Sequence, residues 1–346
     1  MMRTVFRVFA LLMAFTLLAS SAGFAGGNDR VGTSSAPQLL IPVGARGLAM
    51  GGAMTATATG VEAIYWNPAG LARSDAAATA MFTHMGYIAD MSVNTVAVDA
   101  NLGGFGHLGF GLKAMSIGDI EVTTADNPDG TGMMFSPSFF TLGVTYAKGL
   151  TDNVSFGVNV NLVHEEIKRV GASTLAVDVG VQYVNFAGIN GLSFGMALRN
   201  LGGNMTYDGS GLTGQGKMDD GARPSTSLKV DPASFELPSA LEIGLAYTHD
   251  FGEMGTITGS YMFQNNNFSF DDNKMGLEYS FRNMVFLRGG YTMGMDVPDG
   301  WDYIYGPSFG AGFHKDMGGI DLTLDYAYRF VEVFDSNQMF TVKIGF

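Results

Sequence analysis

Along most of the chain, apolar residues alternate with small or polar ones. Between Val154 and Leu162, for example, five apolar side chains are separated by one Ser, one Gly and two Asn residues. This period of two puts the apolar side chains on one face of a β-strand. The pattern therefore predicts an all-β fold. Fourteen such runs follow the first 76 residues, at 78–87, 92–101, 107–115, 139–148, 154–164, 173–183, 192–201, 239–248, 256–264, 274–281, 285–291, 307–314, 320–328 and 339–346.

The lengths of the runs and of their connections indicate a particular all-β architecture. Most runs are close to the roughly 9–11 residues that a tilted strand needs to cross a bilayer. Several connections after odd-numbered runs are long, at 116–138, 202–238 and 292–306, whereas those after even-numbered runs are short. Short turns at one end and long loops at the other are typical of outer-membrane barrels. We therefore predict a 14-stranded antiparallel transmembrane β-barrel surrounded by outer-membrane lipid.

A soluble β-sandwich is the alternative, because it also alternates apolar and polar residues. Its polar face would carry many Lys, Glu and Thr residues, whereas here that face is mostly Gly, Ala, Ser, Asn and Thr. Tyr and Phe also recur at the ends of the runs, where barrels place aromatic girdles. Both features favour the barrel. The final residue, Phe346, resembles the recognition signal of the barrel-assembly machinery, which we expect to be a partner.

The first 25 residues have the pattern of a secretory signal peptide. Arg3 and Arg7 precede an apolar run at 8–18, and small residues follow up to Ala25. We expect residues 1–25 to be removed on export. Beyond them no run of 18 or more apolar residues occurs, which excludes a protein that crosses the membrane with helices.

Composition and charge exclude several classes of function. Only 15% of the 346 residues are charged, and the formal net charge of −13 argues against a nucleic-acid partner. The absence of Cys excludes disulfides, thiolate metal sites and catalytic thiols. The five His residues have no metal-ligand spacing. We expect no catalytic, cofactor-binding or metal site and no enzyme activity, although a Ser/His hydrolase assembled from distant residues stays an alternative.

Residues 26–76 do not alternate, and we expect them to form an N-terminal hatch inside a barrel at 77–346. A 14-stranded ring is wider than an eight-stranded one, whose interior side chains nearly fill it, so it has room for a folded segment. Small residues at 44–53 allow the backbone to approach a wall closely. Asn67 can cap a short helical turn that has Pro68 at its first position.

Two segments of this hatch read GARGLAMGGA at 44–53 and AIYWNPAGLA at 63–72. They resemble the N-terminal hatch of the FadL outer-membrane transport superfamily, in particular its PorV/PorQ-like branch. The resemblance implies a bacterial outer-membrane barrel whose hatch rearranges to open a route for hydrophobic ligands. A cap that merely seals the lumen is the alternative. Further similar segments lie at 197–202, 237–247, 276–279 and 287–291. The expected hatch or gating residues are Gly44, Arg46, Gly51, Gly52, Asn67, Pro68 and Ala69.

Charged residues on the inward-facing positions of the runs form a second group of candidates. A charge in a narrow, low-dielectric lumen needs a partner, so we expect Arg46, Arg199 and Arg288 to bridge carboxylates and hold hatch and wall in register. A polar permeation track is the alternative. The expected lumen charges are Lys113, Asp178, Arg199, Glu242, Glu278, Arg288, Asp321, Asp325 and Lys343.

Two functions are consistent with these features. The leading hypothesis is hatch-gated, passive transport of small hydrophobic molecules. The second is a PorV-like carrier that binds the C-terminal signal domains of type IX secretion cargo. The similarity to that branch and the polar, Gly-rich loop at 202–238 support the second hypothesis.

Overall fold

The computed structural model describes residues 30–216, 226–295, 297–298 and 303–346. The expected signal peptide and the first four residues of the expected hatch lie outside these residues.

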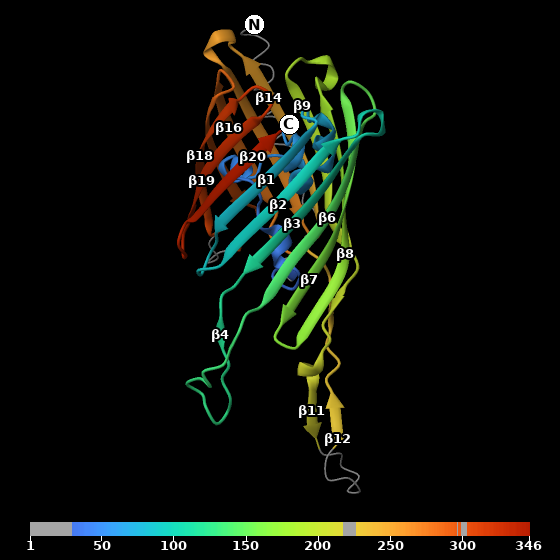
Figure 1. The fold of residues 1–346 in the computed structure, drawn as a ribbon, viewed down its shortest axis with the longest axis vertical. Coiled ribbons are helices and arrows are strands. Elements are labelled where there is room, and N and C mark those ends of the chain that lie inside the picture. Colours follow the sequence, from blue (N-terminus) through green and yellow to red (C-terminus); the bar gives the residue numbers. More distant parts are fainter. Residues whose placement is uncertain (1–29, 217–225, 296, 299–302) are drawn as a thin grey trace.

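Within the described residues, fourteen antiparallel strands close into one barrel (Figure 1). The first strand pairs with the last as well as with the second. This confirms the predicted fold, and each expected run agrees with a strand to within three residues at either end. The barrel strands are β1 (Ala78–Gly86), β2 (Ser92–Asn101), β3 (His107–Ser116), β6 (Ser138–Gly149), β7 (Val154–Ile167), β8 (Val170–Val184), β9 (Leu192–Gly202), β14 (Ala240–Asp250), β15 (Thr256–Asn266), β16 (Asp272–Phe281), β17 (Val285–Gly294), β18 (Tyr305–Asp316), β19 (Asp321–Val331) and β20 (Asn337–Gly345).

The alternation in the sequence becomes an outer apolar face and an inner face of small and polar residues. In β1, the outward Phe82 is 48% exposed, whereas Met81 and Thr83 on either side of it are each 2% exposed. An apolar belt of this kind is unfavourable in water and favourable in the hydrocarbon core of a bilayer. The outer face therefore fits a lipid environment.

The two ends of the barrel differ. Short turns at 150–153 and 282–284 lie at the end that we call the short-turn end, and the longest connections lie at the opposite, long-loop end. Small hairpins project there, and β11 and β12 extend far beyond the barrel wall (Figure 1). The hairpin strands are β4 (Ile120–Glu121) with β5 (Met134–Phe135), β10 (Met205–Thr206) with β13 (Ser234–Phe235), and β11 (Thr213–Gly216) with β12 (Thr226–Lys229). Single 3₁₀ turns occur at η5 (Gly103–Phe105), η6 (Phe186–Gly188), η7 (Ser210–Leu212) and η8 (Gly252–Met254).

The described part of the hatch, residues 30–76, lies inside the barrel. Its α2 contacts β17 to β20, whereas its η4 contacts β6 to β8, so the segment spans the lumen between different walls. Arg30 bonds to Asn267 at the long-loop end, and Arg73 donates to the carbonyl of Asp152 at the short-turn end. The helical elements of the hatch are η2 (Pro37–Leu40), α2 (Ala45–Ala49), η3 (Gly60–Glu62), α3 (Ala63–Trp66) and η4 (Pro68–Arg73).

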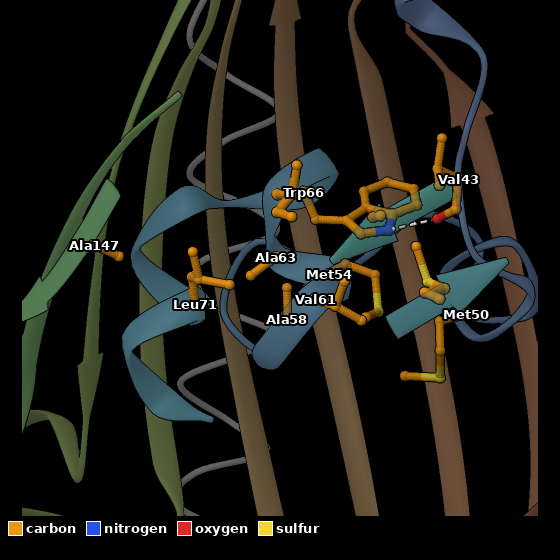
Figure 2. Packing of buried hydrophobic residues seen from close by; sticks show 12 residues of the cluster. Val43, Met50, Met54, Ala58, Val61, Ala63, Trp66, Leu71 and Ala147 are labelled. Atoms are coloured by element: carbon orange, nitrogen blue, oxygen red, sulfur yellow. Dashed lines mark hydrogen bonds between the residues drawn. The ribbon is translucent and has the colours of Figure 1, made fainter. Parts of the chain in front are cut away.

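An apolar cluster joins the hatch to the wall (Figure 2). Met50, Met54 and Leu71 are fully buried in it, together with Ala147 of β6. The indole Nε1 of Trp66 donates to the carbonyl of Val43 at 2.9 Å, so its polar atom is satisfied within the cluster. Among the described residues, no helix is both long and apolar enough to cross a membrane.

Glycines on the inner wall let the hatch backbone come close. A Cβ atom on Gly157 of β7 would lie 2.3 Å from the carbonyl carbon of Pro68, and one on Gly290 of β17 would lie 2.1 Å from the amide nitrogen of Gly51. Any larger residue at these positions would push the hatch away from the wall. The 49 glycines of the chain are therefore partly explained by this close packing.

Candidate functional site

Arg46 of α2 ties the hatch to the wall through Glu278 of β16. Its Nε and Nη2 atoms donate to the two carboxylate oxygens of Glu278 at 2.9 and 3.0 Å, which is a bidentate pair. Arg288 of β17 donates from Nε to the same carboxylate at 2.5 Å. Burial alone would lower the pKa of Arg46, but the carboxylates of Glu278, Glu62 and Asp325 outweigh burial and raise it. Arg46 therefore stays charged inside the lumen.

Asp325 and Glu62 extend this contact into a closed network. Arg288 Nη1 donates to Asp325 at 2.6 Å, and Lys343 lies 3.3 Å from Asp325 and 3.2 Å from Glu62. Glu62 belongs to the hatch and also lies 3.8 Å from Arg46. The network contains three cations and three carboxylates, so buried charges are balanced without an external ion. We call these six residues the latch: Arg46, Glu62, Glu278, Arg288, Asp325 and Lys343.

A second polar network joins the hatch to β8, β9 and β14. Arg199 lies 3.6 Å from Asp178 and 3.7 Å from Glu242, and its Nη1 donates to the carbonyl of Trp66 at 3.1 Å. The hydroxyl of Thr55 in the hatch donates to Glu242 at 2.8 Å. The backbone of the hatch is thus bonded directly to charged groups of the wall.

Asn67 both caps the helical turn η4 and contacts the barrel wall. Its Oδ1 accepts from the amide of Ala69 at 3.2 Å, which caps η4, and Pro68 occupies the first position of that turn. Its Nδ2 donates to the carbonyls of Thr55 and Val181 at 2.7 and 3.1 Å. The side chain is fully buried, so it holds three backbone segments together.

The three predicted hatch glycines all have positive φ angles. Gly44 precedes α2 with φ 86° and lies beside Glu62, whereas Gly51 and Gly52 follow α2 with φ 62° and 80°. A side chain is strained in this conformation. The glycines therefore fix how the chain enters and leaves α2, which carries Arg46.

Asp321 lies apart from both networks. It is the first residue of β19 at the short-turn end, its side chain is 54% exposed, and His314 lies 3.2 Å from it. By contrast, Lys113 of β3 is buried in the lumen and donates to the carbonyl of Ile41 in the hatch at 3.2 Å.

Several buried or cavity-lining charged residues were not among those predicted from the sequence: Glu62, Asp99, Glu165, Asp272, Lys274 and Arg329. Glu62 lies in the hatch, where no alternation shows which side chains point to the wall. Lys274 lies four residues before Glu278 in the same strand, so the two side chains point to the same face. The alternation therefore did contain a signal for Lys274. Arg329 lies four residues after Asp325 and points to the same face, but it lies one residue beyond the expected run at 320–328.

A cavity of about 340 Å³ remains in the lumen on the long-loop side of the hatch. The hatch segment 37–43 and Trp66 form one side of it, and inward residues of the barrel form the other. Four basic side chains line it, against two carboxylates, Glu242 and Asp272. Among the described residues, no group of three or more His, Cys, Asp or Glu side chains could hold a metal ion. The basic side chains are Lys113, Arg199, Lys274 and Arg329.

Residues 24–219 match the family model of the type IX secretion system protein PorV. This match covers the hatch and the first half of the barrel. No curated protein matches the chain.

Solved channel and transporter structures have the same fold at low sequence identity. The toluene transporter TodX of Pseudomonas putida is 15% identical, with 87% of this chain and 96% of that chain covered and a TM-score of 0.54. The CymD monoaromatic hydrocarbon channel is 14% identical, with 88% and 97% covered and a TM-score of 0.53. With the family match, this shared fold places the barrel in the bacterial outer membrane.

Proposed function

The chain belongs to the family of the type IX secretion system protein PorV, and from this we propose that it binds the C-terminal signal domains of secreted cargo at its long-loop end. The observation that carries the proposal is a lumen blocked by the hatch, beneath loops that project from the barrel. Apolar packing and two polar networks fix the hatch to several walls. A folded protein domain has no route through such a barrel, so cargo would bind outside it.

Exposed apolar side chains on the projecting loops support this location. Met133 just before β5 and Met134 at its start are 60% and 61% exposed, and Val230 after β12 is 62% exposed. Phe235 of β13 is 40% exposed. Apolar residues of this kind at a loop surface are suited to a protein partner.

Cargo capture by loop variants tests the proposal. We expect V230S/F235S and M133S/M134S to retain at least tenfold less cargo than the wild type when the barrel is purified from cells with the type IX machinery. L150S is a matched control, because Leu150 is 65% exposed at the short-turn end. Wild-type amounts of cargo on both loop variants would contradict the proposal.

Passage of small molecules is a second candidate function, favoured by the luminal cavity and by the fold shared with hydrocarbon channels. The hatch would have to move, and the latch opposes that motion. Uptake of labelled toluene by cells with and without the protein tests this candidate. We expect faster uptake with the protein, and equal uptake would eliminate the candidate.

A further inference from the structure

We propose that the luminal cavity is a binding site for a small aromatic carboxylate. The proposal rests on the charges, the apolar groups and the size of the cavity. It does not depend on cargo binding, because the cavity lies within the barrel and the projecting hairpins lie outside it.

Lys113 is the first cavity residue whose charge an anionic ligand would neutralise. It is 5% exposed, and its ammonium donates to one backbone carbonyl, that of Ile41, although it has three N–H donors. It forms no ion pair with any carboxylate in the described part of the chain. A buried cation without a counter-charge is unfavourable, and an entering anion would supply the missing charge.

Asp178 of β8, the carboxylate that acts electrostatically on Lys113, is already engaged by other groups. Asp178 accepts from the side chains of Asn159 and Asn161 at 3.1 and 2.9 Å and from the amide of Asn200 at 2.7 Å. It also lies beside Arg199. Asp178 is therefore shared among several partners, and Lys113, which it attracts electrostatically, forms no ion pair with it.

Arg329 of β19 is a second cation without a carboxylate among the described residues. It is 9% exposed, and it donates from Nε and Nη2 to a single amide oxygen of Asn337 at 3.1 and 2.7 Å. Its guanidinium stacks over the ring of Tyr305, 3.8 Å from the centroid. This stacking holds the guanidinium beside the cavity, with donors left for a ligand.

The lining also provides an apolar surface for the body of the ligand. Leu39, Ile41 and Val43 contribute it from the hatch, and Trp66, Tyr65 and Tyr305 add aromatic rings. Aromatic rings pack well on such surfaces. An inorganic anion would satisfy the cations but leave this surface unused, and an uncharged hydrocarbon would leave the cations unpaired.

The size of the cavity sets the size of the ligand. A volume of about 340 Å³ is at the lower end of the roughly 300–1,000 Å³ of ligand pockets. Charge, lining and volume together therefore indicate a single ring with one carboxylate, for which benzoate is the simplest probe.

Calorimetric titration of the purified full-length protein in an uncharged detergent tests the proposal. Benzoate is compared with toluene, which has the ring without the charge, and with acetate, which has the charge without the ring. We expect benzoate to bind at least tenfold more tightly than either. Quenching of tryptophan fluorescence gives a second readout, because Trp66 lines the cavity and is one of two tryptophans in the chain.

Variants assign the binding to the cavity. K113M should weaken benzoate binding at least tenfold, K113R should restore most of it, and R329Q should weaken it in the same direction. K148M is the matched control, because Lys148 is exposed near the short-turn end, and it should bind as the wild type does. Heat-modifiable migration on gels confirms that each variant is folded.

Three results would overturn the proposal. They are no heat or quenching with benzoate, equal affinity for toluene and benzoate, and unchanged benzoate affinity in both K113M and R329Q. The cargo-loop variant V230S/F235S should bind benzoate normally, so failure of the proposed cargo function and failure of the cavity site remain distinguishable.

Discussion

At the scale of single residues, the hatch is held by buried charges that are matched in number and in position. Glu278 receives both Arg46 and Arg288, so one carboxylate joins the hatch to two neighbouring strands. Removing one partner of a buried ion pair leaves an uncompensated charge, which costs more than the pair contributes. The carboxylate of Glu278 is therefore the most sensitive point of the latch.

We predict that E278Q lowers the free energy of unfolding by about 3–5 kcal/mol, because Arg46 loses its bidentate partner. Urea titration of the protein in lipid vesicles measures the change. D321N is the control: Asp321 is 54% exposed and pairs only with His314 among the described residues, so about 0–1 kcal/mol is expected. Equal losses in the two variants would show that the latch contributes no more than a surface pair.

At the scale of elements, the strands were predictable, whereas most helical elements inside the predicted hatch were not. A barrel strand has apolar residues facing lipid and small or polar residues facing the lumen, which gives a strong period of two, as in β7. This period predicted the positions of all fourteen barrel strands. The hatch is buried on several sides, so α2 shows no amphipathic period that predicts it. Asn67 and Pro68 are the exception, because their residue types cap a turn in any context. The hairpin strands at the long-loop end have two to four residues and were missed for lack of a pattern.

Close packing between η4 and β7 makes a second prediction. G157A should destabilise the protein by about 1–3 kcal/mol, because the new methyl group would overlap the backbone at Pro68. G259A in β15 has open space around it and should be neutral or stabilising by about 0.5–1 kcal/mol, since Ala costs less backbone entropy than Gly. The same urea titration compares the two. A neutral G157A would mean that η4 does not press against this wall.

At the scale of the whole molecule, the sequence predicted the barrel and most charged residues of the lumen, but not their pairing. The alternation within each strand placed Glu278, Arg288 and Asp325 on the inner face of the barrel. The partners of Arg46 could not be predicted, because Glu62 comes from a segment without a period and the other residues come from distant strands. The cavity lies between the hatch and the barrel wall, so its shape depends on how distant segments pack and could not be predicted from local sequence patterns.

The position of the hatch inside the barrel can be tested directly in the membrane. The chain contains no Cys, so an engineered pair cannot exchange with another thiol of the protein. A Cβ atom on Gly244 of β14 would lie 3.3 Å from the Cβ of Thr55 in the hatch, close to the roughly 3.5–4.5 Å of a disulfide. We predict that T55C/G244C forms this bond in isolated outer membranes, as read by mass spectrometry, whereas T55C/G310C does not. Absence of the bond in T55C/G244C, or equal bonding in both pairs, would contradict the account.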